Sequence, residues 1–207
     1  MQLAGILLYP WLESWPGGRA LLAAFGVFVL GVALRVVQRS PWLTWLALVL
    51  AVGVVGLSAA HLVAPHPALP VAIAVLQSLF YFYATGSLIA YMLRDWVATT
   101  DDLFAAGATF TLLAWGFAHA FAACEAVVPG SFSAPVNPAG PRTWMELLYL
   151  SVAVLSSVGL SDILPVTGLA RALVILESFV GVMYIALVVS RVVGLTMLAR
   201  ERRPPIQ

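Results

Sequence analysis

The stretch RTWMELLYLSVAVLSSVGLSDILP, residues 142–165, joins an apolar segment of helical character to a short polar one. The apolar part, 142–156, is too short to cross a bilayer core of roughly 30 Å, for which about 20 residues are needed. The polar part, SSVGLSD, then leads directly into a long apolar run. Non-helical backbone is tolerated at membrane depth only where protein buries it or water lines it. The stretch therefore predicts a re-entrant loop, in which a half-helix enters the membrane and an extended return follows.

The composition of the whole chain also places it in a bilayer. Of its 207 residues 62% are hydrophobic and 9% are charged, with a mean hydropathy of +1.01. Such a chain cannot cover an aqueous surface. Its basic residues are all arginine and its formal net charge is +1, which gives no argument for a nucleic-acid partner. The one cysteine, Cys124, cannot form an intrachain disulfide and is interpreted as a packing residue.

Hydropathy predicts an all-α membrane protein with about five transmembrane helices. Breaks rich in proline or arginine separate the apolar runs. An apolar segment near the N-terminus carries Tyr9, Trp11 and Trp15 and suits a helix at the headgroup level. If it partly re-enters the membrane, the count of spans changes. The expected spans are 20–37, 42–63, 69–93, 103–127 and 169–198.

The placement of arginine predicts an N-terminus outside the membrane and a C-terminus inside. Cytoplasmic segments carry an excess of basic residues in membrane proteins. This orientation puts Arg35, Arg39, Arg94, Arg200, Arg202 and Arg203 inside, with Arg191 near the inner boundary, and leaves Arg19, Arg142 and Arg171 outside.

The sequence from Leu147 to Leu195 resembles the pore module of the potassium channel superfamily. That module consists of a pore helix, a filter with the pattern T-T-V-G-Y-G-D, and an inner helix. In particular, the sequence resembles small prokaryotic channels with extra N-terminal helices and no voltage sensor. The resemblance extends weakly back through ATTDDLFAAGATFTLLAWGFAHAF, residues 98–121. The resemblance implies two parts. N-terminal membrane helices occupy 1–98, with an interfacial segment and three spans, and a pore domain occupies 99–203, with an outer helix at 103–127, a pore helix at 142–156, a filter at 157–162 and an inner helix at 166–199.

The resemblance also implies which residues form the filter. Val158 and Gly159 match the family pattern, whereas Leu160 replaces the filter tyrosine and Ser161 replaces the second glycine. A serine in the left-handed conformation costs roughly 1 to 2 kcal/mol, so we expect the outer carbonyl ring to relax. The implied ion-binding residues are Ser157, Val158, Gly159, Leu160 and Ser161, which would hold K+ or Na+ at their carbonyls, with Asp162, Tyr149, Ser156 and Glu177 as support.

Three of the supporting residues have alternative interpretations. Asp162 could close the filter and add a ring of negative charge, or could simply cap a helix after a polar turn. Tyr149 could bond that aspartate or pack on neighbouring helices. Glu177 lies within the last span, so it must be protonated, hydrated or hydrogen-bonded. It is interpreted as a strut to Ser151 or Ser156, with proton sensing as the alternative.

The inner helix carries the expected cavity and gate. If the family geometry holds, its apolar face lines the cavity and can close it by dewetting. Gly181 could be a bending point or a site of close helix packing. The lining residues are Val182, Ile185, Val189 and Val193.

Four polar residues outside the filter receive structural interpretations. Glu146 is expected to cap the pore helix or pair with Arg142. His119 is expected to be a hydrogen-bonded interhelical residue and not a proton relay. His61 and His66 flank an external loop, and two histidines alone make a poor metal site.

Together these features predict a homotetrameric cation channel of the plasma (inner) membrane with reduced discrimination between K+ and Na+. A fully K+-selective channel and a non-conducting membrane scaffold or accessory subunit are the alternatives. The expected partners are identical subunits and membrane lipids, with no nucleic acid. No cofactor is expected, and K+ and Na+ are the expected permeant ligands. An enzyme is not expected, since the sequence has no Ser/His/Asp cluster, no metal-binding Cys/His spacing and no phosphate-binding glycine loop.

Overall fold

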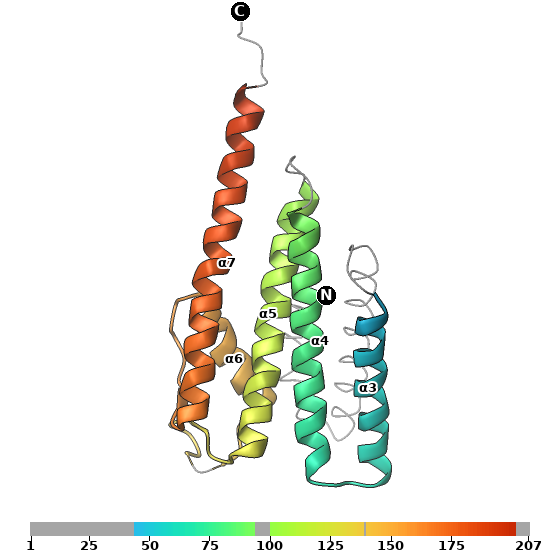
Figure 1. Cartoon of the computed structure of the whole chain (residues 1–207). Helices are drawn as coiled ribbons and strands as arrows, with labels where there is room; N and C mark the ends of the chain where they lie inside the picture. Colours follow the sequence, from blue (N-terminus) through green and yellow to red (C-terminus); the bar gives the residue numbers. More distant parts are fainter. Residues whose placement is uncertain (1–43, 94–99, 139, 202–207) are drawn as a thin grey trace, which may run out of the picture.

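The computed structural model describes residues 44–93, 100–138 and 140–201, which form five helices and one short β-ribbon (Figure 1). Four of the helices are long and apolar enough to cross a membrane, so the expectation of an all-α membrane protein is confirmed. The expected span at 20–37 and the interfacial segment before it lie outside the described residues. The elements are α3 (Thr44–Val63), α4 (Ala68–Met92), α5 (Thr100–Val127), β1 (Phe132–Ser133), α6 (Trp144–Leu155), β2 (Leu164–Pro165) and α7 (Gly168–Glu201).

The long helices stand side by side, with α4 between α3 and α5 and with α6 beside the lower half of α7 (Figure 1). Small residues let α4 and α5 approach closely, as is common between membrane helices. The Ser78 hydroxyl donates to the Gly116 carbonyl at 2.9 Å, and a Cβ at Gly116 would lie 2.9 Å from the ring of Phe82. The interior of the fold therefore lies where α4, α5 and α6 meet. Its largest fully buried apolar side chains are Tyr81, Phe80, Phe121, Phe132, Leu147, Leu148, Leu155 and Ile163.

The short helix α6 has a strong start signal. Thr143 is its N-cap, and a capping box joins Thr143 and Glu146 in both directions. The helix therefore begins at Trp144, two residues after the expected start. Arg142 also pairs with Glu146 at 3.4 Å, so both interpretations of Glu146 are confirmed. At about 1.5 Å per residue, the 12 residues of α6 span about 18 Å, which is too short to cross a bilayer core.

The chain after α6 returns to the end of the molecule where α7 begins (Figure 1). The β-ribbon fixes this return, because Phe132 pairs with Pro165 and Ser133 with Leu164. Next to the ribbon, the Thr167 hydroxyl donates to the Ser131 hydroxyl at 3.0 Å. Val166 donates its N–H to Ser131 O at 2.9 Å, so it is still held beside the ribbon, and α7 begins at Gly168 and not at 166. Hence α6 and the segment after it form a re-entrant loop between α5 and α7.

The tip of this loop lies deep along α7. A Cβ added at Gly181 would lie only 2.3 Å from the carbonyl oxygen of Leu155, the last residue of α6. Gly181 is about 20 Å along α7 from Gly168 at 1.5 Å per residue. The end of α6 therefore lies about 20 Å along α7 from its start, a distance greater than half the thickness of a bilayer core of roughly 30 Å.

Candidate functional site

The backbone after α6 alternates in the sign of φ. Ser157 has a φ of 60° and Gly159 a φ of 67°, whereas the residues next to them are not in the positive-φ region. Ser157 donates its N–H to Val154 O and Gly159 donates its N–H to Ala153 O, both at 2.9 Å. The segment is thus folded back on the last turn of α6. A serine at positive φ costs roughly 1 to 2 kcal/mol, so the surrounding structure imposes this conformation.

The alternation does not continue to Ser161, which has no positive φ. Instead, Ser161 donates its N–H to Gly159 O at 3.1 Å, and its hydroxyl accepts the N–H of Ile163 at 3.1 Å. The residue that stands in place of the second filter glycine therefore makes a local turn.

In the single chain, side chains of the segment expected to form the filter, 157–162, are exposed. The exposed fractions of Val158 and Leu160 are 69% and 72%, and Asp162 is also exposed. Tyr149 on α6 is 45% exposed, and within the described part of this chain no hydrogen bond joins it to Asp162. The roles expected for this pair stay predictions. An apolar surface of this kind marks contact with lipid or with another protein surface.

A buried polar cluster near the end of α6 joins three helices. Glu177 of α7 and Ser151 of α6 are both fully buried. The Ser151 hydroxyl lies 2.5 Å from Glu177 Oε1 and 2.9 Å from the carbonyl oxygen of Ala114 in α5. Ser156, the other serine considered for Glu177, donates to Ala153 O within its own helix at 3.2 Å. We call Glu177, Ser151 and Ala114 the three-helix cluster.

The two faces of α7 differ in burial. Glu177, Gly181 and Tyr184 face the same chain and are buried, and the Tyr184 hydroxyl donates to the Ala106 carbonyl of α5. The expected cavity residues lie on other parts of the helix surface. Val182, Ile185 and Val189 are 56%, 39% and 54% exposed, and Val193 lies outside the residues whose side chains are described.

At Gly181 the structure shows close helix packing, one of the two alternatives for this residue. A Cβ added at this position would lie 2.3 Å from Leu155 O, so there is no room for a side chain. A bending role for the same residue stays a prediction.

Two further polar residues, His119 and Glu125, make contacts that stabilise the fold. His119 does lie between helices, stacked on Tyr81 of α4 with 5.5 Å between ring centroids and 5.9 Å from the ring of Trp144 in α6. Glu125, near the end of α5, accepts the N–H groups of Gly130 and Phe132 at 3.0 and 3.1 Å. Sequence reasoning missed this role, although a carboxylate placed just before the Pro129–Gly130 turn was a usable signal.

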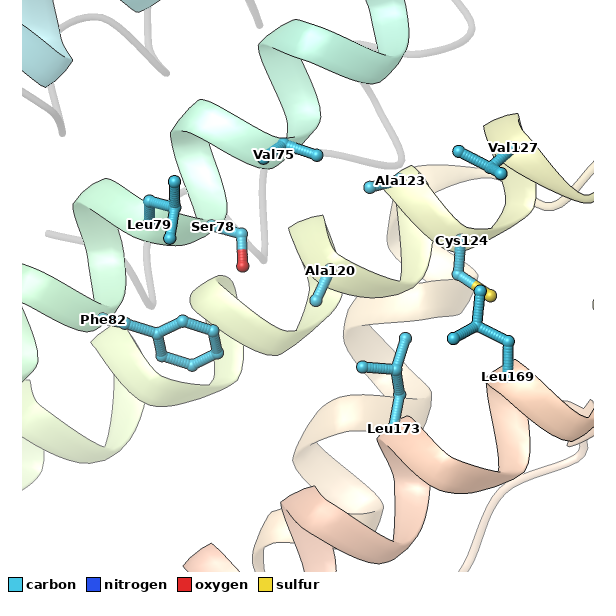
Figure 2. Close-up of a pocket in the computed structure, with 10 residues that line it drawn as sticks. All are labelled: Val75, Ser78, Leu79, Phe82, Ala120, Ala123, Cys124, Val127, Leu169 and Leu173. Carbon is cyan, nitrogen blue, oxygen red and sulfur yellow. The ribbon is translucent and has the colours of Figure 1, made fainter.

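An apolar groove of about 290 Å³ lies between α4, α5 and α7 (Figure 2). Cys124 lines it, which agrees with a packing role, and Ser78, the hydroxyl-bearing residue of the lining, already donates to Gly116 O. The groove offers no charged group to an ion. In 44–93, 100–138 and 140–201 no group of three or more His, Cys, Asp or Glu residues could hold a metal ion.

A comparison with protein families identifies the kind of protein to which the re-entrant loop belongs. A family profile described as "Ion channel" matches residues 78–197, which is more than half of the chain and runs from within α4 into the last part of α7. Comparisons with curated proteins and with solved structures found no match. The chain therefore belongs to this ion channel family, and its C-terminal half is a potassium-channel-like pore module.

Proposed function

We propose that the protein is a homotetrameric cation channel of the plasma membrane that conducts K+ and Na+ through residues 157–161. The observation that carries the proposal is the re-entrant loop, whose tip lies about 20 Å along α7 and whose φ angles alternate in sign at Ser157 and Gly159. Alternation of this kind turns successive carbonyl groups toward one side, as in filters where carbonyl oxygens replace the hydration shell of an ion. The C-terminal end of α6 adds partial negative charge at the same depth.

Several copies of the chain are needed to make a pore from this loop. Each chain contributes one loop, and identical chains usually assemble with closed symmetry. Val158 and Leu160, together with the exposed Val182, Ile185 and Val189 of α7, give the single chain an uncovered apolar surface beside the loop. Other copies of the same chain would cover part of this surface, and the remainder would line the cavity.

Reduced selectivity follows from the outer half of the filter. Ser161 makes a local turn and does not take the left-handed conformation, so carbonyl sites beyond Gly159 would be wider or absent. Leu160 also lacks the hydroxyl group by which the tyrosine of the family pattern is bonded to the pore helix. Fewer sequential sites give weaker discrimination between K+ and Na+, while the exposed Asp162 would concentrate cations at the mouth.

Ion flux into liposomes tests the proposal. Purified protein of measured subunit number is compared for K+, Na+ and a larger organic cation. Comparable K+ and Na+ flux through a tetramer is the expected result. Flux of K+ alone would favour a selective filter, and no flux at any pH or voltage would favour a scaffold or accessory subunit.

A double variant tests the outer filter itself. Leu160→Tyr with Ser161→Gly restores the family residues and is expected to shift permeability toward K+. Val136→Tyr, at an 80% exposed position in the outer loop, is the matched control and should leave the ratio unchanged. An unchanged ratio in a tetrameric, conducting double variant would contradict our account of the filter.

A further inference from the structure

The three-helix cluster contains more short oxygen contacts than an ionised carboxylate can explain. The Ser151 hydroxyl has two oxygens within reach, Glu177 Oε1 at 2.5 Å and Ala114 O at 2.9 Å. A hydroxyl carries one proton. If Glu177 were a carboxylate, that proton could serve only one of the two contacts, and two acceptor oxygens would face each other across the other.

A protonated Glu177 removes this conflict. The Glu177 acid then donates from Oε1 to Ser151 Oγ, and Ser151 donates its own proton to the Ala114 carbonyl. Both short contacts become hydrogen bonds. Glu177 Oε2, buried with no hydrogen-bond partner within the described residues, is then a neutral carbonyl oxygen and not half of a buried anion. An unpaired charge at this depth would cost on the order of 3 kcal/mol even on insertion scales.

No neighbouring charge offsets the burial of an ionised Glu177. In the part of the chain that the structure describes, no arginine forms an ion pair with it. On α6 the titratable groups are Glu146, which pairs with Arg142, and the half-exposed Tyr149. On α5 the nearest in sequence to Ala114 is His119, whose ring stacks on Tyr81.

The cluster sits where it can set the position of the filter. Ser151 is one turn before Leu155 on α6, and Glu177 is one turn before Gly181 on α7. The hydrogen bond between Ser151 and Glu177 therefore fixes α6 against α7 at one turn, and the close approach of Leu155 to Gly181 fixes it at the next. The filter backbone bonds directly to this part of α6, since Gly159 donates to Ala153 O.

We propose that Glu177 is a protonated positioning residue that, through Ser151, ties the pore helix to the Ala114 carbonyl and holds the filter at its depth. The positioning role rests on the proposed channel function, whereas the protonation does not. A neutral donor at residue 177 is sufficient for this role, and a negative charge is not required.

Infrared spectroscopy of the purified protein tests the protonation without any ion flux. The wild-type protein at neutral pH should show a protonated carboxylic acid band that disappears in Glu177→Gln and changes frequency in Ser151→Ala. The same band in wild type and in Glu177→Gln would overturn the inference, as would its absence from wild type. If the wild-type protein does not conduct ions, the channel proposal is wrong, but the infrared evidence for a protonated Glu177 is unaffected.

Flux measurements test the positioning role. In Glu177→Gln the side-chain amide can still donate to Ser151, so K+ flux per tetramer and the K+/Na+ ratio should stay close to wild type. Glu177→Leu keeps the size but removes the donor, and we expect K+ flux per tetramer to fall on the order of fivefold, the factor that one neutral hydrogen bond is worth, with a changed K+/Na+ ratio. Ser178→Ala, one residue along on the exposed side, is the control. Equal losses in the Gln and Leu variants would show that the charge matters and would refute the proposal.

Discussion

Replacing Gly181 with alanine is expected to displace the end of the pore helix. The added Cβ would lie 2.3 Å from Leu155 O and 3.0 Å from both Leu155 C and Leu155 Cα, whereas ordinary contact begins at 3.4 Å. The helices must therefore separate by about 1.1 Å, the difference between 3.4 and 2.3 Å. The obstructing atoms are backbone atoms, which cannot rotate away as a side chain can. Overpacking of this kind typically costs 1 to 3 kcal/mol.

Two measurements on Gly181→Ala follow from this displacement. The thermal midpoint in detergent should fall by several degrees, since about 1 kcal/mol corresponds to about 2 to 4 °C in a chain of this size. The proposed function also predicts a change in flux, because the backbone N–H groups of Ser157 and Gly159 bond to the last turn of α6. Gly56→Ala, where a Cβ meets nothing within 4 Å, is the control, and alanine there should be neutral or stabilising. A wild-type midpoint and wild-type flux in Gly181→Ala would refute the reasoning.

Three further substitutions test separate contacts. Tyr184→Phe removes the hydroxyl that bonds α7 to α5. It should lower the free energy of unfolding by about 0.5 to 1.5 kcal/mol per chain and so lower the thermal midpoint modestly; an unchanged midpoint would show that this bond adds no stability. Thr143→Ala removes the capping box of α6, at a cost of about 1 kcal/mol, and should speed hydrogen exchange in the first turn of α6 more than in the last. Glu125→Ala should speed exchange of the Gly130 and Phe132 amides, which the carboxylate now accepts, and equal protection in both proteins would count against that role.

The spans and the re-entrant loop could be predicted because they depend on local sequence. The length of an apolar run decides whether a helix can cross a bilayer, and Thr143 followed by Glu146 marks a helix start. The starts of α6 and α7 differ from the expected ones because Thr143 is an N-cap and not a helical residue, and because Val166 and Thr167, next to the ribbon, bond to Ser131 before α7 begins. Two-residue strands have no periodicity that a sequence can display.

Choices between alternatives needed the three-dimensional structure. Burial explained why Glu177 required a partner, but the rotation of α6 about its axis decides that Ser151 and not Ser156 faces it. The same holds for Gly181, since its role depends on a backbone atom far away in sequence. In the filter, the sequence identified Ser161 as the residue at risk of strain, whereas the structure places the strained serine at 157.

The helix before the pore module also supports the pore helix. Rings from three helices follow one another from α4 to the start of α6: Tyr81 stacks on His119, and His119 lies against Trp144, the first residue of α6. The three-helix cluster holds α6 near its other end, where Ser151, one turn before Leu155, bonds to Ala114 of α5 and to Glu177 of α7. The entry of the pore helix thus depends on α4, whereas its tip depends on α7. The family match begins within α4 at residue 78, so α4 belongs in part to the matched domain, in agreement with its contact with the start of α6 through His119.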